Sequence, residues 1–200
     1  MDPAVAIVRA YLHVNGYFTV TEFPVLEAAR GGSFRTVTDL DLLAVRFPGA
    51  GRLVAGPGGL RVGSSPDLHL GTPADGIDML VGEVKEGRAE LNRGATDDDV
   101  LRAALVRFGC CAPDRVEGAL AGLRQRRSAA LGDGHTVRLV AFGSMPPAEP
   151  GSHRVVLLHH VVGFLRAYLR AHWNVLRHAE SKDPALGVLM ALEKAERALP

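Results

Sequence analysis

The sequence predicts an α/β domain in which helices flank a central sheet. Two observations carry this prediction: strand-like segments follow an amphipathic helical pattern near the N-terminus, and helical patterns dominate the second half of the chain. The chain has 200 residues, of which 47% are apolar and 22% charged, so it holds enough apolar material for one core. We therefore expect a single domain over residues 1–200.

The first elements are one helix and a strand hairpin. Apolar residues in 3–14 fall on one side of a helix, and Asn15-Gly16 ends it. The segments 17–26 and 34–47 are rich in β-branched and aromatic residues, and the Gly-rich turn at 30–33 separates them. This arrangement predicts two antiparallel strands.

A long loop and a third strand follow the hairpin. Gly and Pro are dense from 48 to 76, which predicts a loop with one short strand at 59–63. The apolar run at 77–87 predicts a strand that is buried on both faces.

The second half of the chain predicts helices around one more strand. Thr96 is the expected N-cap of a helix that ends near 108, and a second helix is expected over 113–131. A strand at 135–143 and a loop at 143–152 come next.

The last quarter predicts helices only. Apolar residues recur at spacings of three, four and seven from 155 to 176, and a short helix follows Asp183-Pro184.

Acidic residues interrupt two of the predicted strands. Alternation along a strand places Asp39 and Asp41 on one face, with Leu40 and Leu42 on the other. The same alternation places Glu83 and Lys85 together on the third strand. Lys85 is one of only three lysines among 23 basic residues.

A carboxylate inside an apolar strand costs free energy unless a partner or a cation compensates it. If the two strands pair, their carboxylates converge on one point, where a hard cation such as Mg²⁺ would find the oxygen ligands that it prefers. The pattern therefore predicts a metal site.

Asp41 together with Glu83-Val84-Lys85, in this order of elements, resembles the PD-(D/E)xK nucleases. The resemblance covers residues 1–142 and implies a restriction endonuclease-like αβββαβ core with a mixed sheet, followed by a helical extension over 153–200. It implies that Asp41 and Glu83 bind Mg²⁺ or Mn²⁺ and that Lys85 orients or activates the attacking water. Asp39 is a possible further metal ligand.

The chain departs from the family pattern at three places. Thr38 stands where the family has a proline, and the helix at 3–14 has no glutamate. The gap from Asp41 to Glu83 is 42 positions, which is long for the family but is accommodated by the glycine-rich loop. Glu22 or Glu27 could substitute for that glutamate, although both are more typical of surface residues.

The expected function is a metal-dependent nuclease acting on DNA, with Arg124, Arg126 and Arg127 as candidate phosphate contacts. A helix-end role suffices to explain these arginines as well, since positive side chains suit the negative end of a helix. The alternative function is a catalytically silent nuclease-fold module that binds DNA or protein. In either case the C-terminal helices could form a homodimer.

Other polar residues give weaker signals. Asp75 and Asp78 flank the third strand, and Asp78 could add an oxygen ligand. The late histidines, which begin at His153, show no i, i+4 pair, so we expect packing or solvent contact for them. The adjacent Cys110 and Cys111 suit helix-end packing.

Charge and hydropathy set the expected location. The formal net charge is +1, which neither requires nor excludes nucleic acid. No run reaches about 18 apolar residues, and the start of the chain lacks the basic residues of a secretion signal. We expect a cytoplasmic protein with no membrane partner.

Overall fold

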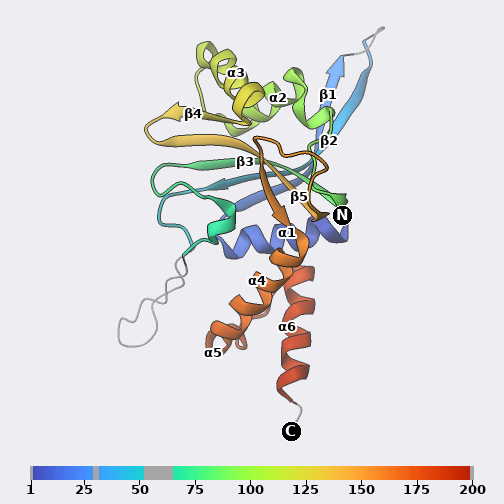
Figure 1. Ribbon diagram of the computed structural model, residues 1–200, viewed down its shortest axis with the longest axis vertical. Helices are drawn as coiled ribbons and strands as arrows, with labels where there is room; N and C mark the ends of the chain where they lie inside the picture. The colour runs from blue at the N-terminus through green and yellow to red at the C-terminus, as the bar shows by residue number, and fades with distance from the viewer. Residues whose placement is uncertain (1, 29–31, 52–64, 199–200) are drawn as a thin grey trace.

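The computed structural model describes residues 2–28, 32–51 and 65–198, and it has an α/β fold with one mixed sheet (Figure 1). Part of the expected turn at 30–33 and the whole expected strand at 59–63 lie outside these residues. The helices are α1 (Pro3–Val14), α2 (Asp98–Phe108), α3 (Val116–Arg126), α4 (Leu158–Ala171), α5 (Trp173–Leu176) and α6 (Pro184–Arg197). The strands are β1 (Phe18–Ala28), β2 (Phe34–Arg46), β3 (Asp78–Arg88), β4 (Ser128–Gly132), β5 (His135–Met145) and β6 (Arg154–Leu157).

The sheet combines antiparallel and parallel pairs. Its order is β1-β2-β3-β5-β4, and β6 pairs with β5. β3 runs parallel to β5, and β5 runs parallel to β6, whereas the other pairs are antiparallel. Because a parallel pair needs a crossover, α2 and α3 connect β3 to the second half of the sheet.

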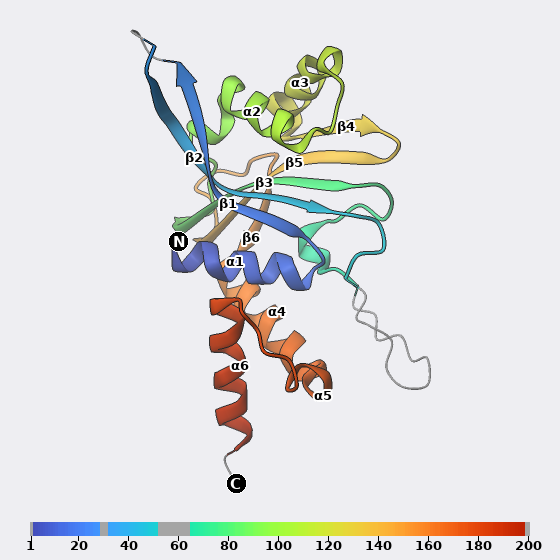
Figure 2. The ribbon, with the colours of Figure 1, turned by 180° about the vertical axis from the view of Figure 1, so that it is seen from behind.

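Helices cover both faces of the sheet. Figure 1 and Figure 2 show α2 and α3 on one face and α1 on the other, with α4 and α6 packed beyond α1. β3 lies between the two cores: Leu80 packs on the α1 side, whereas Met79 and Val81 pack on the α2 and α3 side. Burial on both faces explains the unbroken apolar run that predicted this strand.

Two boundaries of the middle helices differ from the prediction. α2 begins at Asp98 rather than after Thr96, because the Asp97 side chain caps the helix by accepting from Asp99 N at 2.9 Å. The second helix ends at Arg126, since Arg127 adopts a left-handed conformation with φ of 56°. The segment expected to continue it is strand β4, which joins β5 through a tight turn at Asp133-Gly134, where both residues have positive φ.

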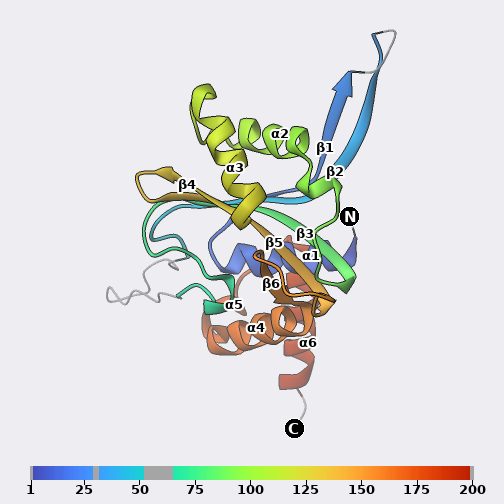
Figure 3. The same ribbon diagram turned by 45° about the horizontal axis from the view of Figure 1, so that its top comes forward.

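The C-terminal extension also begins later than expected. Residues 154–157 form the short strand β6, where Val155 pairs with Ala141 and Val156 with Phe142. β-branched residues suit that position at the edge of a sheet. The helical stripe starts at Leu158, and Figure 3 shows α4 and α6 on the far side of the molecule from α2.

No helix in the described parts of the chain combines the length and apolar character needed to cross a membrane.

The β1–β2 hairpin extends past the rest of the sheet. β1 and β2 pair from Phe18 and Val45 to Ala28 and Phe34, whereas β2 pairs with β3 only from Leu42 to Arg46. The hairpin therefore projects beyond α2, as all three ribbon views show (Figures 1, 2 and 3). β2 and β3 separate at the base of this projection.

Candidate metal centre

Asp41 and Glu83 lie where β2 and β3 separate. The last backbone pair of the two strands is Leu42 with Gly82, and one step further along the register Asp41 stands opposite Glu83. At this point the Asp41 carboxylate replaces the next backbone contact, since Val84 N donates to Asp41 Oδ2 at 2.8 Å. The structure thus brings together two carboxylates that lie far apart in the sequence.

The predicted alternation on β2 is wrong at this point. Leu40 packs with the α2 and α3 core and Leu42 with the α1 core, so they do not share a face. On the neighbouring strand, Glu22 adopts a left-handed conformation with φ of 52°. The change of face falls at Asp41, between the two leucines, and Glu22 lies between their partners Thr21 and Phe23.

Glu83 is a buried acid with little compensation. Only 4% of the residue is exposed. Burial and the nearby charge of Asp41 raise the pKa of Glu83 to about 7, against the opposing effects of Lys85 and a hydrogen bond from Asn92. That bond runs from Asn92 Nδ2 to Glu83 Oε1 at 2.5 Å. Keeping Glu83 ionised in the folded protein therefore costs free energy.

Asp41 shares this electrostatic environment. Burial raises the pKa of Asp41, the Val84 amide lowers it, and the charges of Asp2 and Asp39 raise it further, while Lys85 lowers it. Asp39 is exposed, so it borders the pair from the solvent side. Of the predicted residues, Asp39 and Lys85 thus act on Asp41, and Asp41 and Lys85 act on Glu83.

Asp2 is a neighbour that the sequence reasoning missed. It caps α1, where its side chain accepts from Ala4 N at 2.7 Å, and its charge acts on Asp41. The body of α1 has no acid, yet its N-terminus brings one to the site. An Asp directly before Pro3 is a capping signal that could have found it.

Lys85 completes the charge pattern. It lies two residues after Glu83 on the same strand and is half-buried, and within the described part of the chain its ammonium group makes no hydrogen bond. Its charge acts on both carboxylates, but it does not return the pKa of either acid to its ordinary value. The two converging carboxylates therefore have too little positive charge around them to offset their own charge. Such a pair suits a divalent cation that prefers oxygen ligands.

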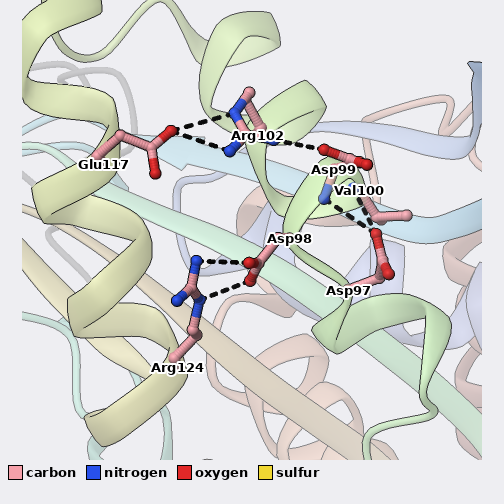
Figure 4. A network of polar contacts seen from close by, with 7 residues as sticks. All are labelled: Asp97, Asp98, Asp99, Val100, Arg102, Glu117 and Arg124. Carbon is pink, nitrogen blue, oxygen red and sulfur yellow. Dashed lines mark hydrogen bonds and ion pairs between the residues drawn. The ribbon is translucent and has the colours of Figure 1, made fainter.

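The three predicted arginines divide into two groups. Arg124 Nε donates to Asp98 Oδ1 at 2.6 Å and ties α3 to α2 (Figure 4). This ion pair occupies Arg124, so its expected role as a phosphate contact is not supported. Arg126 and Arg127 form no ion pair within the described residues, and they line a hollow of about 400 Å³ with Arg154.

A second hollow lies next to the candidate metal centre. It has about 600 Å³, and its lining includes Arg127, Arg93 and Asn92 as well as Glu90 and Glu149. Asn92 is the residue that donates to Glu83. Arg127 therefore shares a hollow with a hydrogen-bond partner of Glu83.

Two other predicted acids lie elsewhere. Asp78 is at the opposite end of β3 from Lys85 and forms a buried ion pair with Arg138, so it does not join the site. Glu27 pairs with Arg35 on the exposed hairpin, as expected of a surface residue.

A second cluster includes one of the late histidines, His160. Asp67, His69 and His160 each offer one ligand atom, and these atoms all lie within 4.8 Å of one another. This group could hold a metal ion. Sequence spacing missed it because the late helix contributes only His160, while its partners come from a turn near residue 68. Although burial opposes the effect, hydrogen bonds from His69 N, His160 and Tyr11 lower the pKa of Asp67.

Comparison of the chain with protein-family models, curated proteins and solved structures found no match.

Proposed function

We propose that this chain is a metal-dependent nuclease with a PD-(D/E)xK-like site at Asp41, Glu83 and Lys85, acting on DNA. The observation that carries the proposal is the under-compensated pair of the buried Glu83 and the partly buried Asp41 at the point where β2 and β3 separate. A protein that needed only a stable fold would gain from an apolar residue at Glu83, because an uncompensated buried charge is costly.

Each side chain has a role in this proposal. Asp41 and Glu83 would hold Mg²⁺ or Mn²⁺, and Asp39 could add an oxygen ligand from the solvent side. When bound, the metal would lower the pKa of a coordinated water and offset charge that develops on the phosphate. The Val84 amide fixes the orientation of the Asp41 carboxylate, and Asn92 fixes that of Glu83.

Lys85 supplies a proton donor and a positive charge next to the carboxylates. Its ammonium group can hold a water by hydrogen bonding and can stabilise negative charge on a phosphate oxygen. Arg127 lines the hollow that Asn92 also lines, and Arg126 lines a second hollow together with Arg127, where the phosphates of a bound strand would reach them.

Cleavage of linear, circular and single-stranded DNA in Mg²⁺ and in Mn²⁺ tests the proposal. We expect Lys85→Ala to lower cleavage by about 100-fold or more, because it removes an electrostatic contact at the reacting group. Lys182→Ala is the matched control, since Lys182 is an exposed lysine that pairs with Glu180. It should cleave like the wild type.

The alternative function, a catalytically silent nuclease-fold module that binds DNA or protein, makes the opposite prediction. If the wild-type protein binds DNA but cuts none of the substrates with either metal, the catalytic proposal is wrong and the binding role stands. If Lys85→Ala cleaves at the rate of Lys182→Ala, another residue carries the activity.

We also propose a homodimer through the C-terminal helices. Val188 and Leu192 on α6 are 61% and 55% exposed and lie four residues apart, so they share one face of the helix. Sedimentation of the wild type and of Val188→Glu/Leu192→Glu measures this: the wild type should sediment as a dimer and the variant as a monomer.

A further inference from the structure

We propose that Asp67, His69 and His160 form a second metal site, which takes a divalent transition metal of the zinc class. This site is separate from the candidate centre at Asp41 and Glu83 and does not depend on the proposed function.

Two distant segments build the cluster. Asp67 precedes the 3₁₀ turn Leu68–Leu70 and caps it, accepting from His69 N at 2.9 Å. His69 lies inside that turn, and His160 lies in the first turn of α4. The fold therefore brings the loop before β3 against the start of the C-terminal helices.

The two imidazole rings converge on one carboxylate. His160 Nε2 lies 2.5 Å from Asp67 Oδ2, and His69 Nδ1 lies 3.4 Å from Asp67 Oδ1. The rings themselves lie 3.9 Å apart between centroids, with 33° between their planes. One nitrogen of each ring lies beside the same carboxylate, so the two imidazoles and the carboxylate can share one cation.

Two buried residues, one in α1 and one at its C-terminal end, hold Asp67 in place by hydrogen bonds to its carboxylate and its backbone. Tyr11 OH donates to Asp67 Oδ2 at 2.8 Å, and Asp67 N donates to Asn15 Oδ1 at 2.7 Å. Both Tyr11 and Asn15 are buried. Outer hydrogen bonds of this kind orient metal-binding side chains before the metal arrives.

The ligand set indicates the kind of metal. Two imidazole nitrogens and one carboxylate oxygen suit Zn²⁺, Co²⁺ or Ni²⁺, whereas Mg²⁺ prefers oxygen ligands and retained waters. The side chain of His69 is 65% exposed and that of His160 is 26% exposed, so solvent can supply a fourth ligand. Since Zn–N bonds are about 2.0 to 2.1 Å long, His160 must move back from Asp67 by about 1 Å to admit the ion.

Titration of the untagged full-length protein with Co²⁺, followed by visible absorption, and equilibrium dialysis against Zn²⁺ test this site. We expect one equivalent of metal per chain and a melting temperature that rises when the metal is added. His69→Ala and His160→Ala should each bind at least tenfold more weakly. Tyr11→Phe should bind about tenfold more weakly, as loss of an outer-sphere partner predicts.

Controls separate this site from other histidines and from the first metal centre. His178→Ala removes an exposed histidine outside the cluster and should bind like the wild type. Glu83→Gln should also keep Co²⁺ and Zn²⁺ binding. His69 is exposed, so its replacement leaves the core unchanged. The proposal is overturned if the wild type binds less than one equivalent, or if His69→Ala binds like His178→Ala.

Discussion

Strand β3 carries two buried acids with opposite surroundings. Asp78 is 1% exposed and Glu83 is 4% exposed. Arg138 donates to both oxygens of Asp78 at 2.9 and 2.8 Å, and the Tyr17 and Thr136 hydroxyls donate as well. Among the described residues, the Glu83 carboxylate receives one hydrogen bond, from Asn92, and it faces the like charge of Asp41.

The comparison separates a structural acid from a candidate functional one. Asp78 has a full set of donors within the protein, so its charge needs nothing further. Glu83 has the burial of a structural acid without the partners, and such strained positions persist where function requires them. Each prediction below tests one side of this contrast.

The largest expected effect is the loss of the Arg138 partner. Arg138→Met leaves Asp78 buried without its counter-charge, which should lower the free energy of unfolding by about 3 to 5 kcal/mol. Urea denaturation at neutral pH measures it. Arg126→Met, at an exposed arginine, should change stability by less than about 0.5 kcal/mol. Equal effects for the two variants would contradict the structural role of Asp78.

Removal of the Glu83 charge should raise the free energy of unfolding rather than lower it. The folded protein binds the Glu83 proton more tightly than the unfolded chain, since its pKa is about 7 rather than 4.5. Stability therefore falls as pH rises from about 4.5 to 7, and the penalty persists above that range. Glu83→Gln should be more stable than the wild type by roughly 2 to 3 kcal/mol at pH 8 and similar to it at pH 4.

Denaturation curves at the two pH values measure this effect. Glu86→Gln, at an exposed position on the same strand, is the control and should show no such difference. If Glu83→Gln is less stable than the wild type at pH 8, Glu83 is a structural acid like Asp78.

Replacement of Asn92 should change the pKa of Glu83 and the stability of the protein by a smaller amount. Asn92→Ala removes the only hydrogen bond from a side chain to Glu83 within the described residues, so the pKa of Glu83 should rise further. The acid limb of the pH profile of cleavage should then move to higher pH, and stability should fall by about 1 to 2 kcal/mol. Asn174→Ala, at an exposed asparagine, should leave the profile in place.

The smallest effect is expected for the arginines at the end of α3. Arg126→Gln/Arg127→Gln should weaken DNA binding about tenfold and reduce the salt slope of log K by about 2. Arg124→Gln is the matched control because Arg124 pairs with Asp98. Fluorescence anisotropy without metal measures both variants, and an equal loss in Arg124→Gln would refute this division of the three arginines.

Local patterns predicted the elements that carry the candidate metal centre. The helix at 3–14 and the strands that bear Asp41 and Glu83 follow from periodicity within each segment, and the structure confirms them. β4 was missed because the chain from 128 to 132 can continue a helix by composition, and only the left-handed Arg127 ends α3. A backbone conformation of that kind leaves little trace in the sequence.

Contacts between distant segments were the least predictable part. The Asp67, His69 and His160 cluster depends on how α4 docks against the 3₁₀ turn, and no spacing rule connects those positions. The same limit hid Asp2, whose effect on Asp41 depends on where α1 crosses the sheet. By contrast, Asp41 and Glu83 were predictable together because neighbouring strands hold them in register.

Binding of Mn²⁺ to the protein tests the central claim most directly. In a His69→Ala background, which silences the second site, the free Mn²⁺ signal in electron paramagnetic resonance reports binding at Asp41 and Glu83 alone. We predict one bound Mn²⁺ per chain, lost in Asp41→Asn and in Glu83→Gln and retained in Glu86→Gln. Equal Mn²⁺ binding by all four proteins would contradict the account.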